Sequence, residues 1–450
     1  MKALAMWWQT YILVAMAVLL APVPRGRAGE PAFPAPAAKS GTHDAAGSDT
    51  MAPATGSRTW SVGTPIVTYW AGPAMTDAVA TQMADGGFNV VWCAEKDLDL
   101  VHRHGLRAQL TDGLLAPATL DNPAQREKLD ALIARVAKHP AMYCYFITDE
   151  PSAGAFAPLG RLVAYLRERD PAHMAYINLF PTYANNEQLG TKGDVVTAYR
   201  EHLRQYVEVV RPALISYDHY QFAVNGDNDQ YFLNLAMIRR AADDANLPFL
   251  NIVQACTWVP AVMRLPKPDE MRYLVYTTAA YGAQGISYYV YCCKDHVGGI
   301  ALPDGTPTPI YHALKSLNRE FVAIATQTQP LRWMAAYHTG MTPPGAVALP
   351  ADAPFRLDPA VAPIAARPRE RVRGILLGLW GEAGQGSPKA IPTHVLVVNM
   401  DYAAAVTTAL VGPGPLQAFN ATDRKWSPAA GNRAQLSLPP GGGTLLRVAQ

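Results

Sequence analysis

Two adjacent carboxylates follow an apolar run near the middle of the chain. The run Tyr143-Cys144-Tyr145-Phe146-Ile147 continues as Thr148-Asp149-Glu150-Pro151. Paired carboxyl groups can act as acid and base when nearby negative charge and apolar surroundings raise the pKa of one of them towards neutrality. The structural alternative is a helix start, because Asp caps a first helical turn and Pro suits the first helical positions. The segment predicts acid–base chemistry, with this alternative open.

A third carboxylate, Asp218, stands in the segment Ser216-Tyr217-Asp218-His219-Tyr220 after a second apolar run. We expect Asp218 to be a nucleophile, a base or an orienting group, and the alternative is an ion pair with a basic neighbour. His219 is an acid or ligand candidate, although a single His without partners more often forms a hydrogen bond in a protein wall. The candidate catalytic residues are therefore Glu150, Asp218 and Asp149, with Glu150 as the proton donor.

Aromatic and polar residues follow the other apolar runs of the chain. Aromatic rings stack on the C–H faces of sugar rings, whereas carboxylates and amides form hydrogen bonds with sugar hydroxyls. The alternatives are solvated loop carboxylates for the acidic members of this set, and core or rim packing for the tryptophans. The predicted substrate-binding residues are Tyr69, Trp70, Trp92, Glu95, Asp112, Asn178, Tyr217, His219, Tyr220, Gln254, Trp258, Tyr288 and Tyr291.

A repeating pattern of short and long segments must position these residues. From residue 64 onwards, short apolar, β-branched or aromatic runs alternate with longer amphipathic stretches. Eight such units over roughly 260 residues predict a (β/α)8 barrel, whose working residues lie past the C-terminal ends of its strands. A doubly wound open sheet is the alternative, but no Gly-rich phosphate loop follows the first run. The predicted strands are 66–70, 89–93, 107–110, 142–147, 174–179, 214–217, 249–253 and 286–291, and the predicted helices are 75–84, 98–104, 125–138, 159–168, 195–210, 232–245, 268–281 and 311–326.

The last part of the chain has a different character. Short apolar runs are separated there by Gly and Pro, and this spacing predicts a small antiparallel, β-sandwich-like domain. A connection rich in Pro and Ala, residues 342–369, precedes most of these runs. We expect the barrel to occupy residues 61–330, and the connection plus β domain to occupy residues 331–450. The runs are 374–380, 394–399, 406–411, 416–420 and 444–448.

The N-terminus resembles a secretory signal peptide. Lys2 precedes an apolar stretch over residues 11–23, and the small residues Gly26 and Ala28 offer a cleavage site. The stretch is shorter than the roughly 20 residues that a spanning helix needs, although a retained membrane anchor is the alternative. We therefore expect residues 1–28 to be removed after Ala28, and a secreted or periplasmic protein without stable membrane insertion. Residues 29–60, rich in Ala and Pro, are predicted to be a disordered spacer.

Composition and charge exclude several classes of function. Of the 450 residues 50% are hydrophobic and 16% are charged, against a usual charged share of about 25%, which excludes a disordered protein. The net charge of +2 favours neither nucleic acid nor an anionic membrane as a partner. The five cysteines leave at least one unpaired and allow one disulfide. No CxxC, HExxH or GxSxG motif occurs, so we expect no metal, no cofactor and no serine-hydrolase site.

Taken together, these features resemble a known family. The order of signal peptide, eight βα units, Thr148-Asp149-Glu150-Pro151 and a trailing β domain resembles secreted TIM-barrel glycoside hydrolases, in the clan of family 42 β-galactosidases and family 5 endoglycanases. In that clan the acid/base Glu closes strand four, which implies this role for Glu150. The clan has Asn before it, where this chain has Asp149. The nucleophile of the clan is a Glu at the end of strand seven, where this chain reads Val253-Gln254-Ala255-Cys256.

The missing strand-seven carboxylate leaves the nucleophile open. Barrels of the α-galactosidase type pair carboxylates from strands four and six, which favours Asp218 as the substitute. Chitinase-like barrels place a Tyr-Asp pair on strand six, so that a substrate acetamido group acts as nucleophile while Tyr217 and Asp218 orient it. The resemblance implies a glycoside hydrolase that cleaves O-glycosidic bonds of an oligo- or polysaccharide. The alternatives are a non-catalytic carbohydrate-binding barrel, and a lyase or metal-assisted hydrolase.

Overall fold

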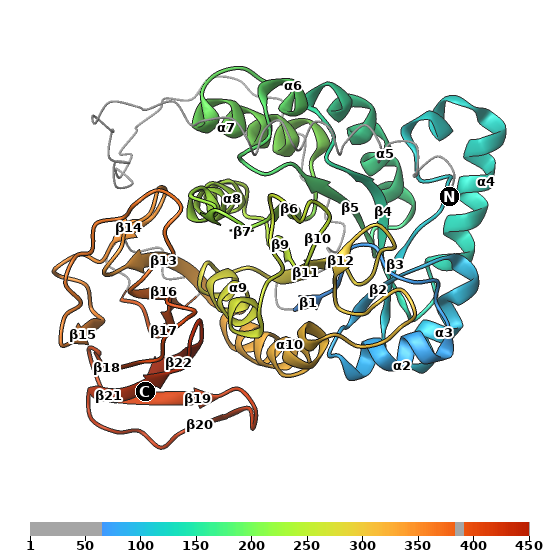
Figure 1. Cartoon of the computed structure of the whole chain (residues 1–450). Helices are drawn as coiled ribbons and strands as arrows, with labels where there is room; N and C mark the ends of the chain where they lie inside the picture. The colour runs from blue at the N-terminus through green and yellow to red at the C-terminus, as the bar shows by residue number, and fades with distance from the viewer. Residues whose placement is uncertain (1–64, 383–390, 450) are drawn as a thin grey trace, which may run out of the picture.

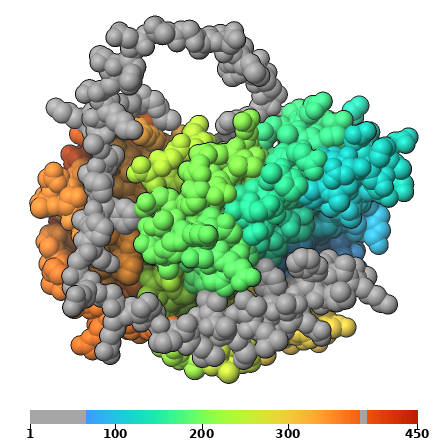
Figure 2. Space-filling model, turned by 90° about the horizontal axis from the view of Figure 1, so that it is seen from above, coloured from blue at the N-terminus to red at the C-terminus, as the bar shows by residue number. Residues whose placement is uncertain are grey.

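The computed structural model describes residues 65–382 and 391–449. The predicted signal peptide and spacer lie outside the described residues. An eight-stranded parallel sheet with surrounding helices is followed by mainly antiparallel sheets, so the predicted (β/α)8 barrel with C-terminal β structure is confirmed (Figure 1). Seen from above, the C-terminal sheets, in orange, pack directly against the barrel, in green to blue (Figure 2). Within the described ranges, no helix combines the length and apolar character that crossing a membrane requires.

The barrel strands lie in the order β1-β11-β9-β6-β5-β4-β3-β2, and all neighbours are parallel. Asn89 joins the two ends of this order: its backbone N–H donates to Val67 O at 3.0 Å, and its Oδ1 accepts from Val67 N at 2.9 Å. At this edge the side-chain oxygen of Asn89 therefore takes the place of the backbone carbonyl that would accept the hydrogen bond in a regular strand pair. The strands are β1 (Ile66–Val67), β2 (Val90–Cys93), β3 (Arg107–Leu110), β4 (Met142–Asp149), β5 (Met174–Leu179), β6 (Ile215–His219), β9 (Phe249–Gln254) and β11 (Gly285–Tyr289).

The helices begin and end within a few residues of the predicted ranges. The start of the helix at Pro123 is fixed by its N-cap. Asn122 Oδ1 accepts from the N–H groups of Ala124 and Gln125, and Pro123 occupies the first helical position. The helices are α2 (Asp77–Asp85), α3 (Leu98–Arg103), α4 (Pro123–Val136), α5 (Phe156–Arg169), α6 (Asn186–Leu189), α7 (Val195–Gln205), α8 (Tyr231–Ala245), α9 (Pro268–Ala280) and α10 (Pro309–Thr328). Loops after the strands carry the short pairs β7 (Phe222–Ala223) with β8 (Gly226–Asp227), and β10 (Cys256–Thr257) with β12 (Val297–Gly298).

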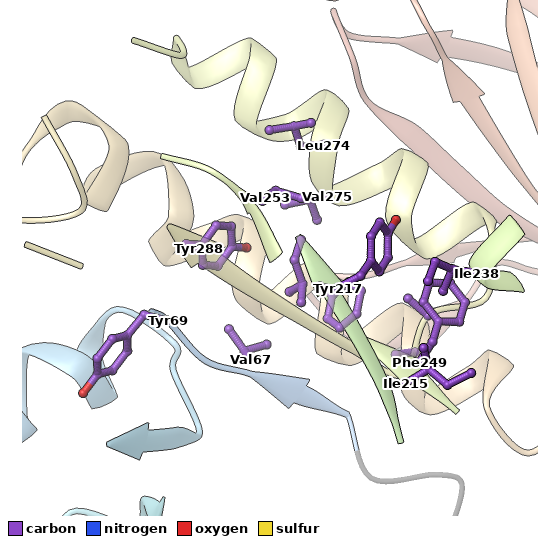
Figure 3. Packing of buried hydrophobic residues seen from close by; sticks show 14 of the residues in the cluster. Val67, Tyr69, Ile215, Tyr217, Ile238, Phe249, Val253, Leu274, Val275 and Tyr288 are labelled. Atoms are coloured by element: carbon purple, nitrogen blue, oxygen red, sulfur yellow. The ribbon is translucent and has the colours of Figure 1, made fainter. Parts of the chain in front are cut away.

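Successive side chains of each barrel strand alternate between the helix layer and the barrel interior. Ile215 on β6 and Phe249 on β9 lie against Ile238 of α8, and Val253 lies beside Leu274 and Val275 of α9 (Figure 3). These helix-facing residues belong to one continuous core. The residues between them along each strand face the interior of the barrel, and this alternation decides which side chains reach the mouth.

The C-terminal strands form a seven-stranded sheet, β14-β13-β16-β17-β22-β19-β20, and a three-stranded sheet, β15-β18-β21. The odd-numbered residues of β16, such as Leu377, contribute to a core between the two sheets, whereas Leu376 and Trp380 pack towards the barrel. The bounds are β13 (Arg332–His338), β14 (Val347–Ala348), β15 (Arg356–Asp358), β16 (Ile375–Gly381), β17 (His394–Asn399), β18 (Val406–Val411), β19 (Leu416–Asn420), β20 (Lys425–Trp426), β21 (Arg433–Leu438) and β22 (Gly443–Val448). The sequence patterns did not predict β13 or β21, both of which carry polar residues.

Gly378 marks a close approach of the two parts. A Cβ on Gly378 would lie 2.3 Å from Ala280 O, at the end of α9. We expect Gly378→Ala to lower the free energy of unfolding by about 1–3 kcal/mol, because β16 and α9 must separate to admit the methyl group. Urea unfolding measures the change. Gly113→Ala is the control, since nothing lies within 4 Å of its Cβ position, and equal losses in both variants would contradict this account.

Candidate active site

A bulge in β4 directs Asp149 into the barrel mouth. In the pairing of β4 with β5, Phe146 lies opposite Tyr176 and Asp149 lies opposite Asn178, with a register shift between Phe146 and Thr148. Because Tyr176 and Asn178 are two residues apart, they share a face, so Phe146 and Asp149 share it too although they are three residues apart. A regular strand would send Asp149 towards the helices instead.

The backbone of Glu150 turns the next carboxyl towards the same place. Glu150 has φ of 42°, in the left-handed region that a residue with a side chain rarely adopts, and its N–H donates to Asn178 O at 2.9 Å. Its carboxyl group forms a hydrogen bond with that of Asp218 on β6. Backbone conformations of this kind are costly, and they concentrate at functional sites. The expected helix start is absent here, because Asp149 ends β4 and α5 begins only at Phe156.

Asn178 connects the carboxyl groups. Its Nδ2 donates to Asp149 Oδ1 at 3.1 Å and to Asp218 Oδ1 at 2.9 Å. Its Oδ1 accepts from Ser216 Oγ at 3.0 Å, and Ser216 Oγ lies 2.7 Å from Tyr176 Oη. Since Asn178 Oδ1 accepts from Ser216, its amide nitrogen must face the two carboxyls. A buried chain of hydrogen bonds inside the barrel therefore fixes the orientation of the amide.

The hydrogen bond between Glu150 and Asp218 requires a proton on one of the two carboxyls, because two carboxylates are acceptors only. Burial, followed by the charges of Asp218 and Asp149, raises the pKa of Glu150 well above its usual range. Burial also raises the pKa of Asp218, but hydrogen bonds from Asn178, Glu150 and Tyr220 oppose it and leave it at about 6. Glu150 therefore holds the proton near neutral pH, and Asp218 is ionised. The alternative that Asp218 pairs with a basic neighbour is not found, because these contacts surround its carboxylate instead.

Asp149 completes the cluster at its open side. Burial and the charge of Asp218 raise the pKa of Asp149 to about 7, although hydrogen bonds from Asn178 and the Glu150 backbone act in the opposite direction. Solvent reaches Asp149, whereas Asp218 is 3% exposed. Asp149 is therefore the member of the cluster that is most accessible from outside.

Two groups of aromatic rings lie at the ends of the barrel strands, and a backbone bridge between Trp70 and Tyr289 connects them. Trp92 on β2 lies 4.9 Å from Trp70, which follows β1, and 4.6 Å from Phe146 on β4, measured between ring centroids. Tyr220, which follows β6, lies 5.1 Å from Tyr289 on β11. Trp258 lies 5.0 Å from each of these two tyrosines. The hydrogen bond of Tyr220 with Asp218 places the second group beside the acidic cluster.

Several predicted binding residues face the helices instead, and the sequence expectation is corrected for them. If Asp218 on β6 points into the barrel, its neighbours in the strand point outwards. His219 accordingly lies 3.0 Å from Asn234 of α8, and Tyr217 is buried in the core (Figure 3). On β11, Tyr288 donates to Asn318 of α10 at 2.7 Å.

The remaining corrections concern side chains that are occupied elsewhere. Tyr291 donates to Gln82, and buried Tyr69 accepts from the Trp92 backbone. Gln254 Oε1 accepts from Phe222 N at 2.8 Å, and its Nε2 donates to backbone carbonyls, so this amide holds the loop after β6. Glu95 pairs with Arg135 at 2.5 Å, and Asp112 Oδ1 accepts from Leu114 N at 2.8 Å. These contacts agree with the structural alternatives rather than with direct binding.

Tyr289 and Phe146 contribute rings to the mouth and were not predicted. Both are half-buried, and the charges of Asp149 and Asp218 contribute to the raised pKa of Tyr289. The signal was present in the sequence, because a strand that turns Tyr288 outwards must turn Tyr289 inwards. All five cysteines are free, and within the described ranges no three His, Cys, Asp or Glu side chains group as metal ligands.

Comparisons with known proteins find the fold but no close relative. No protein-family model and no curated protein matches the chain. A β-galactosidase from Marinomonas ef1 shares 12% identity over 58% of this chain, with a TM-score of 0.41, and this chain covers 60% of its length. A family 27 β-L-arabinopyranosidase from Geobacillus stearothermophilus shares 9% identity, with 87% of this chain and 97% of that chain covered and a TM-score of 0.46. A putative α-L-fucosidase from Bacteroides thetaiotaomicron shares 12% identity over 62% of this chain and 99% of its own, with a TM-score of 0.40.

These solved structures are glycoside hydrolases with TIM-barrel folds, and the chain resembles them in architecture. At such low identities the likeness concerns the fold alone. The chemistry of this chain has to be inferred from its own side chains.

The acidic cluster makes stability depend on pH. The pKa of Asp149 in the folded chain is about 7, above the usual value of 3.8, so the folded chain binds more protons than the unfolded chain between these two pH values. Stability therefore falls as pH rises through this window. We expect Asp149→Asn to melt at a higher temperature than wild type at pH 8, with a smaller difference at pH 4.5, as measured by calorimetry. Asp121→Asn, at an exposed ion pair with Arg161, is the control, and a wild-type pH slope in Asp149→Asn would refute the account.

Proposed function

We propose that the chain is an exported glycoside hydrolase that cleaves O-glycosidic bonds of an oligo- or polysaccharide by carboxylate acid–base catalysis. One observation carries the proposal: the buried carboxyls of Glu150 and Asp218 share a hydrogen bond, which requires a proton on one of them, and burial raises the pKa of Glu150. A protonated carboxyl is what departure of a sugar leaving group requires. The half-buried rings on either side of the cluster supply faces on which sugar rings can stack.

Glu150 is the proton donor of this proposal. Before a substrate binds, the proton of Glu150 lies in its hydrogen bond with Asp218. When a glycosidic oxygen comes within hydrogen-bond distance of Glu150, the proton is transferred to this oxygen. As the bond to the leaving group breaks, positive charge develops on the sugar ring, and ionised Asp218 and Asp149 stabilise it. The apolar rings beside the cluster lower the local dielectric around buried Asp218 and strengthen this interaction.

The contact between Glu150 and Asp218 limits the role of Asp218. Carboxyls that flank a scissile bond lie about 5–5.5 Å apart in retaining enzymes and about 6.5–9.5 Å apart in inverting ones. Two carboxyls joined by a hydrogen bond are closer than either. We therefore assign Asp218 to holding and restoring the proton of Glu150. Asp149 is the base: as the glycosidic bond breaks, a water oxygen bonds to the anomeric carbon and Asp149 takes up a proton of this water, which replaces the proton that Glu150 gave to the leaving oxygen. Solvent reaches Asp149, and a pKa of about 7 suits proton uptake at neutral pH.

A non-catalytic carbohydrate-binding barrel is the second candidate. It is favoured by the end of β9, where Gln254 stands and is fully used in backbone hydrogen bonds. All three carboxyls also lie within one hydrogen-bonded cluster rather than on two sides of the mouth. Such a protein would bind the same sugars through its aromatic rings without cleaving them.

Release of reducing sugar from a panel of glycans tests the proposal. We expect Glu150→Gln to lower kcat about 10²–10⁴-fold, because the amide has no proton to give. We expect Asp218→Asn to move the basic limb of the pH–rate profile to lower pH, because the charge of Asp218 raises the pKa of Glu150. Tyr217→Phe is the control, since this ring is buried in the core, and it should keep the wild-type rate.

Two outcomes would contradict the proposal. If the wild-type chain binds glycans in a calorimetric titration but releases no sugar from any of them, the binding barrel is the correct account. If the chain cleaves a glycan and both Glu150→Gln and Asp218→Asn keep the full rate, the chemistry lies elsewhere in the chain.

A further inference from the structure

A small cavity lies between the loop after β6 and the segment that leads into β16. Its volume is about 30 Å³. Gln221, Asp227 and Phe232 line it from the barrel, and Met341 and Glu370 line it from the C-terminal part. None of the three carboxyls of the candidate active site lines this cavity.

Three acceptor oxygens of this cavity have no hydrogen-bond donor: Gln221 Oε1, Asp227 Oδ2 and Glu370 Oε2. Gln221 is 1% exposed and Asp227 is 3% exposed, so bulk water does not satisfy them. The other oxygens of the two carboxylates are occupied. Tyr402 Oη donates to Asp227 Oδ1 at 2.8 Å, and Arg373 donates to Glu370 Oε1 at 2.6 Å.

Nearby basic groups leave the Asp227 carboxylate incompletely compensated. Arg264 lies 3.9 Å from Asp227 Oδ1, but its closer partner is Glu270 at 2.8 Å. Burial raises the pKa of Asp227 to about 6, although the hydrogen bond from Tyr402 and the charge of Arg264 lower it. Leaving buried acceptors without a partner costs about 1–3 kcal/mol each, and more when they are charged.

The backbone around the cavity is held in place independently of any occupant. Asp227 N donates to Arg369 O at 3.1 Å, and Asp229 Oδ1 accepts from Arg369 N at 2.6 Å. At Gly226 the approach is so close that a Cβ would lie 2.2 Å from Arg369 O. The two segments that carry the three oxygens are therefore joined at Arg369 whether or not the cavity is occupied.

Three unpartnered acceptors that line one small cavity favour an occupant with positive character. One water molecule donates only two hydrogen bonds and would leave an oxygen unsatisfied, whereas a cation contacts all three. Two carboxylate oxygens and one amide oxygen are hard ligands of the kind that Ca²⁺ prefers, and water molecules complete such a coordination shell. Two of these ligands are carboxylates and the third is an amide. The site is therefore compatible with the finding that no three His, Cys, Asp or Glu side chains group as metal ligands in the described ranges.

We propose that this cavity is a calcium-binding site, formed by Gln221, Asp227 and Glu370, that ties the loop after β6 to the C-terminal sheets. Binding joins two parts of the chain that are distant in sequence, so the ion stabilises the folded protein as a whole. The proposal is independent of the glycosidase activity, since its test does not use a substrate.

Calorimetric titration and thermal unfolding of the full chain, first stripped with a chelator, test the site. We expect one Ca²⁺ per chain, and a melting temperature about 5 °C higher at a Ca²⁺ concentration about 100-fold above Kd. Asp227→Asn and Gln221→Met should each weaken Ca²⁺ binding at least tenfold, and Gln221→Met does so without changing the charge. Asp358→Asn, at a surface ion pair with Arg433, is the matched control and should bind as wild type does.

Either of two results would overturn the proposal. If folded wild-type chain shows no Ca²⁺ isotherm and no Ca²⁺-dependent melting temperature, the cavity holds water only. If both Asp227→Asn and Gln221→Met bind Ca²⁺ as tightly as wild type, the ion lies elsewhere.

Discussion

The amide of Asn178 donates hydrogen bonds to Asp149 and Asp218 at the same time, and the rest of the candidate site is arranged around this contact. Three carboxyls gathered in a buried place repel one another when all are charged. Donors from Asn178 and a proton on Glu150 lower this repulsion. A proton in the cluster therefore stabilises it, and under the proposed function this proton is the one that acid catalysis would use.

The barrel makes this contact available because parallel strands end at the same edge. Asn178 on β5 stands between β4 and β6, so it is within reach of a carboxyl from each neighbour. Tyr176 and Ser216 extend the network into the barrel interior, where they fix the amide from below. Strands with both faces buried leave little room for polar groups, and each polar group inside must be satisfied by another.

The sequence predicted the elements well and the directions of the side chains less well. Strand positions follow from apolar runs, and the strand-end rule of barrels was enough to group Asp149, Glu150 and Asp218. Successive side chains of a strand point to opposite faces. Because Asp218 points into the barrel, Tyr217 and His219 therefore point outwards. By contrast, the bulge in β4 and the left-handed backbone at Glu150 are departures from regular structure, and no pattern of residue types encodes them. Without them Asp149 and Glu150 would point to opposite faces.

Isotope-edited infrared titration of chain with labelled Glu carboxyls measures the protonation of Glu150 most directly. The account predicts one Glu carboxyl that is still protonated at pH 7, and whose signal disappears in Glu150→Gln. Ionisation of every Glu near the ordinary pKa of 4.5 would contradict it, because Glu150 would then have no proton for Asp218 or for a substrate.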